Sequence, residues 1–271
     1  EDETLRQRLV KHLRILQRQN IINIWHDRNI SAGTEWEQEI EHHLNAAHLI
    51  LLLISPDFID SDYCYGREMK RAMERHEQGE AHVIPIILRP VYWHKTPFGK
   101  LQALPSDGKP ITSSLWPSQE EALFDASEGI RIAVEEISAK FAKEEAMQCV
   151  FRGNVLYDEQ RYDEAIDAYE QALLYDPACF QAHNNKGSTL GILLRNEEAI
   201  ASFSDALQLL PNDAEISKNL GLSLLYLNRP REAIQVYEKA LSANPKDREL
   251  GRSLSALRDE LESKSELKLL F

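Results

Sequence analysis

The residue in this sequence best placed to do chemistry is a carboxylate near the start of a predicted helix. The apolar run H-L-I-L-L-L-I at 48–54 predicts a buried strand, and the segment S-P-D-F-I-D-S-D-Y-C-Y-G-R-E at 55–68 follows it directly. Glu68 ends this segment, beyond the carboxyl end of the strand, where open α/β sheets bind their ligands. An acid early in a helix also complements the helix dipole, by roughly 0.3–1 kcal/mol. Glu68 therefore has two interpretations, a working carboxylate or one that only solvates the helix.

The elements that must position Glu68 alternate between apolar strands and amphipathic helices. Strands are expected at 21–25, 48–54, 82–88 and 109–112. Helices are expected at 4–19, 35–46, 62–77 and 119–143. Pro85 lies within one strand and suggests an edge position or a bulge there. Continuous apolar strands between helices predict an open parallel α/β sheet.

The second half of the chain repeats with a period of 34 residues. The repeat is carried by five columns of residues: Gly153, Gly187 and Gly221; Ala165, Ala199 and Ala233; Tyr169, Phe203 and Tyr237; Ala172, Ala206 and Ala240; Pro177, Pro211 and Pro245. This is the pattern of tetratricopeptide (TPR) repeats, in which small residues allow paired helices to approach and an aromatic ring fills the space between them. We expect three repeats and a capping helix at 248–262.

The predicted repeats form an all-α solenoid with a concave face that could hold a protein or peptide ligand or another protomer. Asn184, Asn185, Lys218 and Asn219 are expected on that face, where amides and an ammonium could hold a peptide backbone or carboxylate. The boundaries that follow are an α/β domain at 1–143 and the helical repeats at 146–262.

Composition excludes several classes of function. The net charge of −13 argues against sequence-independent nucleic-acid binding, which depends on basic patches. Three scattered cysteines provide neither a disulfide framework nor a C-x-x-C metal site. The apolar runs are too short to span a membrane, and the acidic opening E-D-E-T is unlike a signal peptide. A cytoplasmic location is expected.

Common catalytic motifs are missing from the sequence. It contains no phosphate-binding P-loop, no G-x-G-x-x-G after a strand, no G-x-S-x-G and no H-E-x-x-H. The adjacent His42 and His43 point in different directions on a helix, so no metal site is expected. Cys64 has no histidine close in sequence to activate it, and a structural role is expected for it.

The first half resembles a bacterial Toll/interleukin-1 receptor (TIR) domain. The resemblance is carried by W-H-D-R-N-I-S-A-G-T-E-W at 25–36, by the segment 49–69 and by V-I-P-I-I-L-R-P-V-Y-W at 83–93, and it extends over residues 1 to about 140. It implies a flavodoxin-like parallel sheet. A TIR domain opens with a strand ending in a block like F-I-S-Y. This sequence has no such block, so we expect the first strand to be missing from it.

The resemblance also implies a chemistry, because many TIR domains cleave NAD between nicotinamide and ribose. The family's glutamate follows a block that corresponds here to Ser55, Ser61, Tyr63 and Cys64, which assigns the catalytic role to Glu68. The common form is aromatic-C-x-x-E, whereas Y-C-Y-G-R-E has one residue more, so Tyr63 or Tyr65 occupies the aromatic position. The residues expected to bind substrate are Ser61, Tyr63, Tyr65, Asp27, Gly33 and Trp36. NAD is the substrate, and no cofactor is expected.

Three functions therefore remain open. The first is an NAD glycohydrolase of bacterial signalling or defence that yields ADP-ribose or its cyclic form, assisted by self-association of TIR domains and by a TPR ligand. The second is a non-catalytic scaffold built on TIR–TIR and TPR–peptide contacts. The third is binding of a nucleotide signal without cleavage.

Overall fold

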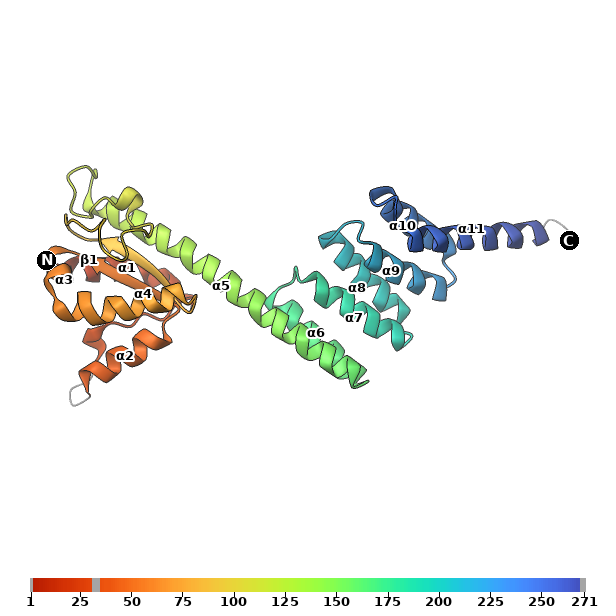
Figure 1. The fold of residues 1–271 in the computed structure, drawn as a ribbon, viewed down its shortest axis with the longest axis horizontal. Helices are drawn as coiled ribbons and strands as arrows, with labels where there is room; N and C mark the ends of the chain where they lie inside the picture. Colours follow the sequence, from red (N-terminus) through yellow and green to blue (C-terminus); the bar gives the residue numbers. More distant parts are fainter. Residues whose placement is uncertain (1, 31–34, 269–271) are drawn as a thin grey trace. The chain divides into compact units, whose positions relative to one another are not determined.

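A computed structural model describes residues 2–30 and 35–268, and the chain divides into the units Glu1–Ala139 and Lys140–Phe271 (Figure 1). The elements of the first unit are α1 (Asp2–Arg18), the 3-10 turn η1 (Asp27–Asn29), α2 (Trp36–Ala46), β1 (Leu49–Ile54), α3 (Pro56–Asp60), the π-helix η2 (Asp62–Glu68), α4 (Met69–Glu77), β2 (His82–Ile87) and η3 (Ser106–Gly108). Helix α5 (Gln119–Asp158) runs from this unit into the next.

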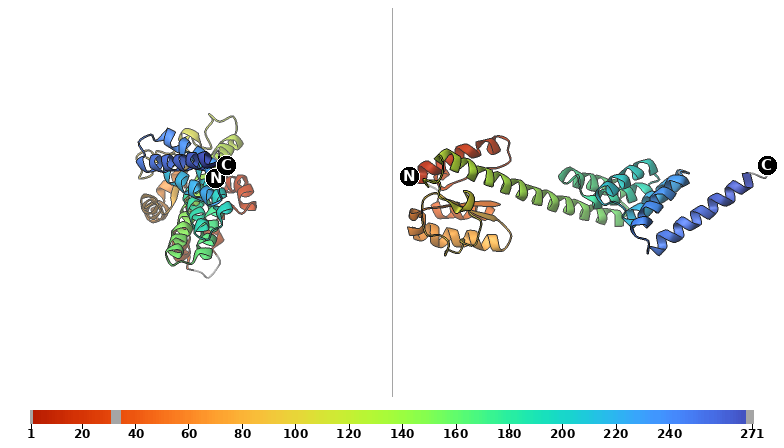
Figure 2. Two further views of the ribbon diagram at one scale, coloured as in Figure 1. Left: turned by 90° about the vertical axis from the view of Figure 1, so that its right-hand side faces the viewer. Right: turned by 90° about the horizontal axis from the view of Figure 1, so that it is seen from above.

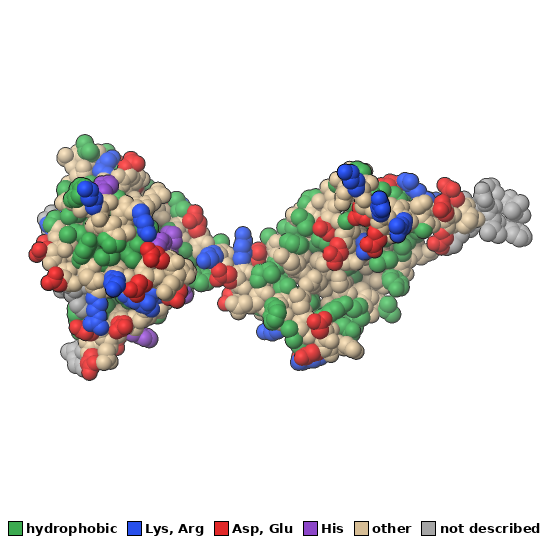
Figure 3. All heavy atoms as spheres, in the orientation of Figure 1, with side chains coloured by type: hydrophobic (Ala, Val, Ile, Leu, Met, Phe, Trp, Pro, Cys, Tyr) green, Lys and Arg blue, Asp and Glu red, His purple; other side chains and the backbone are tan. Residues whose placement is uncertain are grey.

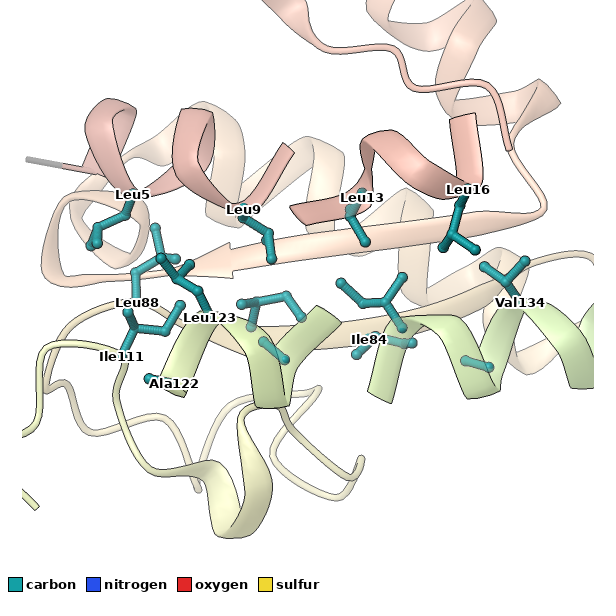
Figure 4. Packing of buried hydrophobic residues seen from close by; sticks show 14 residues of the cluster. Leu5, Leu9, Leu13, Leu16, Ile84, Leu88, Ile111, Ala122, Leu123 and Val134 are labelled. Carbon is teal, nitrogen blue, oxygen red and sulfur yellow. The ribbon is translucent and has the colours of Figure 1, made fainter. Parts of the chain in front are cut away.

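The two strands pair in parallel, from Leu49 opposite His82 to Ile54 opposite Ile87. Both are continuous apolar runs because helices cover both of their faces. Leucines of α1 and residues of α5 pack on one face, and α4 packs on the other (Figure 2). Figure 4 shows the row Leu5, Leu9, Leu13 and Leu16 of α1 pointing into this layer. The expected parallel α/β arrangement is confirmed.

Pro85 sits in regular register opposite Leu52, without the bulge that the sequence suggested. His82 and Leu88 donate to carbonyls on the β1 side, at 2.8 Å each, whereas the Pro85 carbonyl accepts from Leu104 on the other side, also at 2.8 Å. Since N–H and C=O of one residue point the same way in a parallel strand, the missing N–H of Pro85 lies outside the β1 ladder. The proline therefore costs that ladder no hydrogen bond.

Two of the expected strands are not strands in the structure. Residues 21–25 are irregular, although Ile22 and Ile24 still pack against the core formed by α1 and α5. Residues 109–112 are irregular and end in a turn at 111–112, but Ile111 donates to the Ile87 carbonyl at 2.9 Å and Thr112 to the Leu88 carbonyl at 3.2 Å. Pro110 contributes no N–H of its own, so only a short run of backbone pairing forms there.

The second unit is a stack of antiparallel helices that continues from α5. Its further elements are α6 (Tyr162–Tyr175), α7 (Phe180–Ile192), α8 (Asn196–Leu209), α9 (Ala214–Tyr226), α10 (Pro230–Ala243) and α11 (Arg248–Lys268). The alanine and aromatic columns are buried throughout. Each proline of the last column lies two residues beyond the end of α6, α8 or α10, because proline cannot continue a helix. The helical repeat fold is confirmed.

The columns meet across each helix pair. A Cβ atom added at Gly153, Gly187 or Gly221 would come within 2.4, 2.8 or 2.1 Å of the aromatic ring of its own repeat. These rings are Tyr169, Phe203 and Tyr237. Glycine is therefore required at this column by the close approach of the two helices.

The turns between paired helices repeat as well. Gln160, Leu194 and Asn228 all have positive φ angles, of 62°, 59° and 56°. The next residue in each turn is an arginine that pairs with a glutamate three residues later, in the pairs Arg161–Glu164, Arg195–Glu198 and Arg229–Glu232. At the end of the stack, Leu250, Leu254 and Leu257 of α11 are buried against the repeats. The last helix thus covers the apolar end of the final repeat.

Candidate functional site

Glu68 closes the π-helix η2, immediately before α4 begins at Met69. Its side chain is half-buried and lines a hollow of about 230 Å³. The other lining residues come from two elements, α2 and the η2–α4 segment: Glu37, Ile40, Glu41, Leu44, Arg67, Lys70, Arg71 and Glu74. The hollow thus lies between α2 and the η2–α4 segment, so its wall joins segments about 30 residues apart in the chain.

Charged pairs line the hollow around Glu68. Arg67 Nη1 lies 2.8 Å from Glu37 Oε2, which joins η2 to α2. Arg71 Nε donates to Asn45 Oδ1 at 2.8 Å, and its Nη1 lies 3.6 Å from Glu74 Oε2. The η2–α4 wall carries both acidic and basic side chains, so a ligand here would meet carboxylates and cations together.

The π-helix explains the unusual spacing before Glu68. In a π-helix the backbone hydrogen bonds join residues five apart, so each bonded turn contains one residue more than in an α-helix. Such turns are frequent at functional sites. The seven residues Asp62–Glu68 form this turn. The additional residue of Y-C-Y-G-R-E is therefore absorbed before α4 starts, and the acid stays at the beginning of the helix.

The structure places the other predicted site residues at varied depths. Tyr65 is half-buried and packs against the core, with its ring 6.5 Å from that of Phe58 in an edge-to-face arrangement. Ser61 is half-buried, and its carbonyl accepts from Tyr65 N at 2.9 Å. Asp27 and Trp36 are exposed. Gly33 and the side chain of Tyr63 lie outside what the structure describes. Of the predicted residues whose side chains the structure describes, Glu68 alone lines the hollow.

A network at the carboxyl ends of β1 and β2 was not predicted. Ser55, fully buried, caps α3 through Phe58 N and donates to Asp2 Oδ2 at 2.6 Å. Arg89 Nε donates to Asp2 Oδ1 at 2.6 Å, and its Nη2 reaches Asp57 Oδ2 at 2.5 Å. Burial opposes ionisation of Asp2, but hydrogen bonds from Arg89 and Ser55 outweigh it and hold the pKa of Asp2 below its ordinary value.

A buried arginine anchors the end of α2, one wall of the hollow. Arg75 is only 5% exposed, and its Nη1 donates to the carbonyls of Leu44 and Ala47 at 2.5 and 2.6 Å. Its Nε also lies 3.3 Å from Glu80 Oε2. The last carbonyls of a helix have no partner within the helix, so this cation satisfies them and complements the helix dipole. Helix α4 contains both Arg71 and Arg75, and the sequence alone does not indicate which of the two is buried.

Amide side chains meet on the helical repeats, and two of them, Asn184 and Asn185, are among the four residues assigned to the concave face. Asn185 Nδ2 donates to Asn154 Oδ1 at 2.8 Å, and Asn184 Nδ2 lies 3.3 Å from Asn185 Oδ1. Asn154 Oδ1 also accepts from the Tyr169 hydroxyl at 2.8 Å. Lys218 pairs with Glu249 at 2.8 Å.

Comparison with known families agrees with this architecture. Residues 1–113 match the family model of the TIR domain, and residues 152–214 and 195–257 match two tetratricopeptide repeat models. The chain therefore contains a TIR domain followed by tetratricopeptide repeats. None of the helices in the described residues is both long and apolar enough to cross a membrane.

Individual relatives match one half of the chain at a time. "Uncharacterized protein y4lF" of Sinorhizobium fredii (strain NBRC 101917 / NGR234) is 55% identical over 132 residues, which is 49% of this chain and 40% of that protein. This chain thus matches less than half the length of that curated relative. Solved structures similar to this chain include the first TPR domain of human RPAP3 (25% identity, 46% of this chain and 98% of that one, TM-score 0.42) and the Sgt2 TPR domain from Aspergillus fumigatus (23%, 45% and 82%, TM-score 0.42).

Proposed function

We propose that the TIR domain is an NAD glycohydrolase with Glu68 as its catalytic carboxylate, acting in bacterial signalling or defence in the cytoplasm. The observation that carries the proposal is the position of Glu68, half-buried in the wall of a hollow immediately before α4. Ligands of open α/β sheets bind beyond the carboxyl ends of the strands, and α4 begins on that side.

The chemistry requires one carboxylate. Cleavage of the bond between nicotinamide and ribose leaves positive charge on the ribose, in an oxocarbenium-like transition state. A nearby carboxylate stabilises this charge and accepts hydrogen bonds from the ribose hydroxyls. Nicotinamide leaves as a neutral molecule, so its departure needs no general acid. Attack by water then gives ADP-ribose and releases one proton, whereas attack by a group of the same molecule gives a cyclic product.

The size of the hollow bears on how NAD would be held. Ligand pockets commonly enclose roughly 300–1,000 Å³, whereas this hollow encloses about 230 Å³. A dinucleotide would extend beyond it and would need a further surface to cover it. We propose that a second TIR domain supplies this surface, so activity per molecule should rise with protein concentration.

The test is release of nicotinamide from NAD by the full chain. Glu68→Gln keeps the size of the side chain and removes its charge, and should lower the rate at least about a hundredfold. The matched control is Glu77→Gln at the exposed far end of α4, where the carboxylate pairs with Lys100 at 3.2 Å. Equal rates for Glu68→Gln and the unchanged protein would contradict the assignment.

A non-catalytic scaffold is the second candidate, and the small hollow favours it. In that case TIR–TIR and TPR–peptide contacts would be the whole function, and NAD would not be consumed at any concentration. The third possibility is binding of a nucleotide signal without cleavage. Calorimetric titration with NAD tests it, because heat of binding without release of nicotinamide would indicate a nucleotide sensor.

A further inference from the structure

Helix α5 carries apolar side chains on two different faces within the second unit. One face holds Ala146, Val150 and Gly153, which pack against α6. A second face exposes Met147 (45%), Phe151 (71%) and Val155 (43%). These three residues recur every four positions, so they form one stripe along the helix. A helix that is apolar on both sides is normally buried on both.

The stripe is bordered by charge of opposite sign at its two ends. The stripe is preceded by Lys140 and Lys143 and followed by Asp158. In a helix with about 3.6 residues per turn, the same side carries Lys140, Met147, Phe151 and Asp158. The amino-terminal part of this face is an open surface formed by Lys140, Lys143, Glu144, Met147, Gln148 and Phe151. Figure 3 shows hydrophobic side chains at the surface of this unit between its charged ones.

We propose that this stripe is the contact between two copies of the chain, with the α5 helices antiparallel about a twofold axis at the level of Cys149. That axis places Lys140 of each copy opposite Asp158 of the other, because both lie nine residues from Cys149. Met147 and Phe151, each two residues from Cys149, then face one another across the axis. Apolar side chains thus meet at the centre and opposite charges meet at both ends, the arrangement typical of stable interfaces.

Charge also selects this register over the neighbouring one. Shifting the axis to Phe151 would place Glu144 opposite Asp158, each seven residues away, and two like charges would oppose each other at both ends. With the axis at Cys149, Glu144 faces the neutral Asn154. The exposed pair Lys140–Glu144, 3.8 Å apart within one helix, is weak enough to exchange for the intermolecular pair.

The test is the molecular mass of the full chain in solution, measured by sedimentation over roughly a hundredfold range of protein concentration. The unchanged protein should reach the mass of a dimer. Phe151→Glu should weaken the dimer at least about thirtyfold, since buried aromatic anchors dominate such contacts. The matched control, Leu174→Glu on α6, also replaces a highly exposed apolar residue of the same unit (75% exposed) and should leave the dimer intact.

A charge exchange distinguishes self-association from capture of a different partner. Lys140→Asp should weaken the dimer, because an aspartate then faces Asp158. Adding Asp158→Lys in the same chain should restore it, because each new lysine meets the new aspartate of the other copy. A monomer at every concentration, a dimer insensitive to Phe151→Glu, or no recovery in the double variant would each overturn the proposal. The readout is mass alone, so the result is independent of any activity on NAD.

Discussion

The ring of Tyr169 lies against Gly153, so that a Cβ atom on the glycine would come within 2.4 Å of the ring edge. The same contact joins glycine and aromatic residue in each of the three repeats. The ring is buried and its hydroxyl donates to Asn154, so it has little room to move away. This contact sets the separation of α5 and α6.

Gly153→Ala should therefore destabilise the repeats, by about 1–3 kcal/mol, because the added methyl group forces a shift in a packed core. Gly191→Ala provides the control. It is also a helical glycine, but a Cβ there has nothing within 4 Å, and alanine should stabilise the helix by up to about 1 kcal/mol. Urea unfolding followed by circular dichroism measures both. Equal effects of the two changes would contradict the proposed close approach.

Alkaline pH should weaken the repeats through Tyr169. Burial raises the pKa of its phenol from 10.0 to about 12. The unfolded chain ionises first, so the stabilising contribution is complete below pH 10.0 and is lost as pH rises toward about 12. Tyr169→Phe should remove this part of the pH dependence. Phe203 already fills the equivalent place in the second repeat. Thermal unfolding across this pH range is the measurement, with Tyr226→Phe at an exposed tyrosine as the control.

The turn between α7 and α8 should accept a stabilising change. Leu194 has a φ of 59° and is 70% exposed, so its side chain gains little from burial while its backbone is in the left-handed region. Asparagine tolerates this region better than leucine, so Leu194→Asn should stabilise the protein by about 0.5–1 kcal/mol. The reverse change, Asn228→Leu, sits at the equivalent turn with a φ of 56° and should destabilise by a similar amount. A melting temperature that moved the same way in both would contradict this account.

Loss of the buried arginine in the TIR domain should be costly. Arg75→Met removes the donor from the Leu44 and Ala47 carbonyls, and leaving buried acceptors unpaired costs about 1–3 kcal/mol. Arg71→Met, one turn earlier on α4, removes a partly exposed arginine (38% for its side chain) and should cost less than about 1 kcal/mol. Denaturant midpoints compare the two. Similar losses would mean that the capping bonds contribute little.

Features set by neighbours in the sequence could be predicted from it. The glycine, alanine and aromatic columns depend on helix pairs joined by short turns, so their spacing along the chain determines their contacts. Strands β1 and β2 were predicted because both are continuous apolar runs. By contrast, I-I-N-I-W at 21–25 has the composition of a strand but pairs with none in the described residues. A strand forms only where a neighbouring strand pairs with its backbone, and the local sequence pattern does not show whether such a neighbour is present.

The candidate site was predictable only in part, for the same reason. The position of Glu68 after an apolar strand could be read along the chain. The wall opposite it comes from α2, and the network of Asp2, Ser55 and Arg89 joins residues 87 positions apart. Such contacts depend on how elements pack, and a single sequence carries no signal for them. The π-helix was visible only as one residue too many before Glu68.

Helix α5 places Ala122, Leu123 and Ile130 in the core of the TIR domain and Ala146 and Val150 in the core of the repeats. Proteases that separate domains usually cut irregular linkers, and the continuous helix offers them none between Gln119 and Asp158. A fragment carrying the TIR domain alone would have to end inside this helix, where its last carbonyls would lose their partners, and a fragment carrying the repeats alone would begin there, where its first N–H groups would lose theirs. The two halves should therefore resist excision at their junction, and digestion should begin elsewhere in the chain.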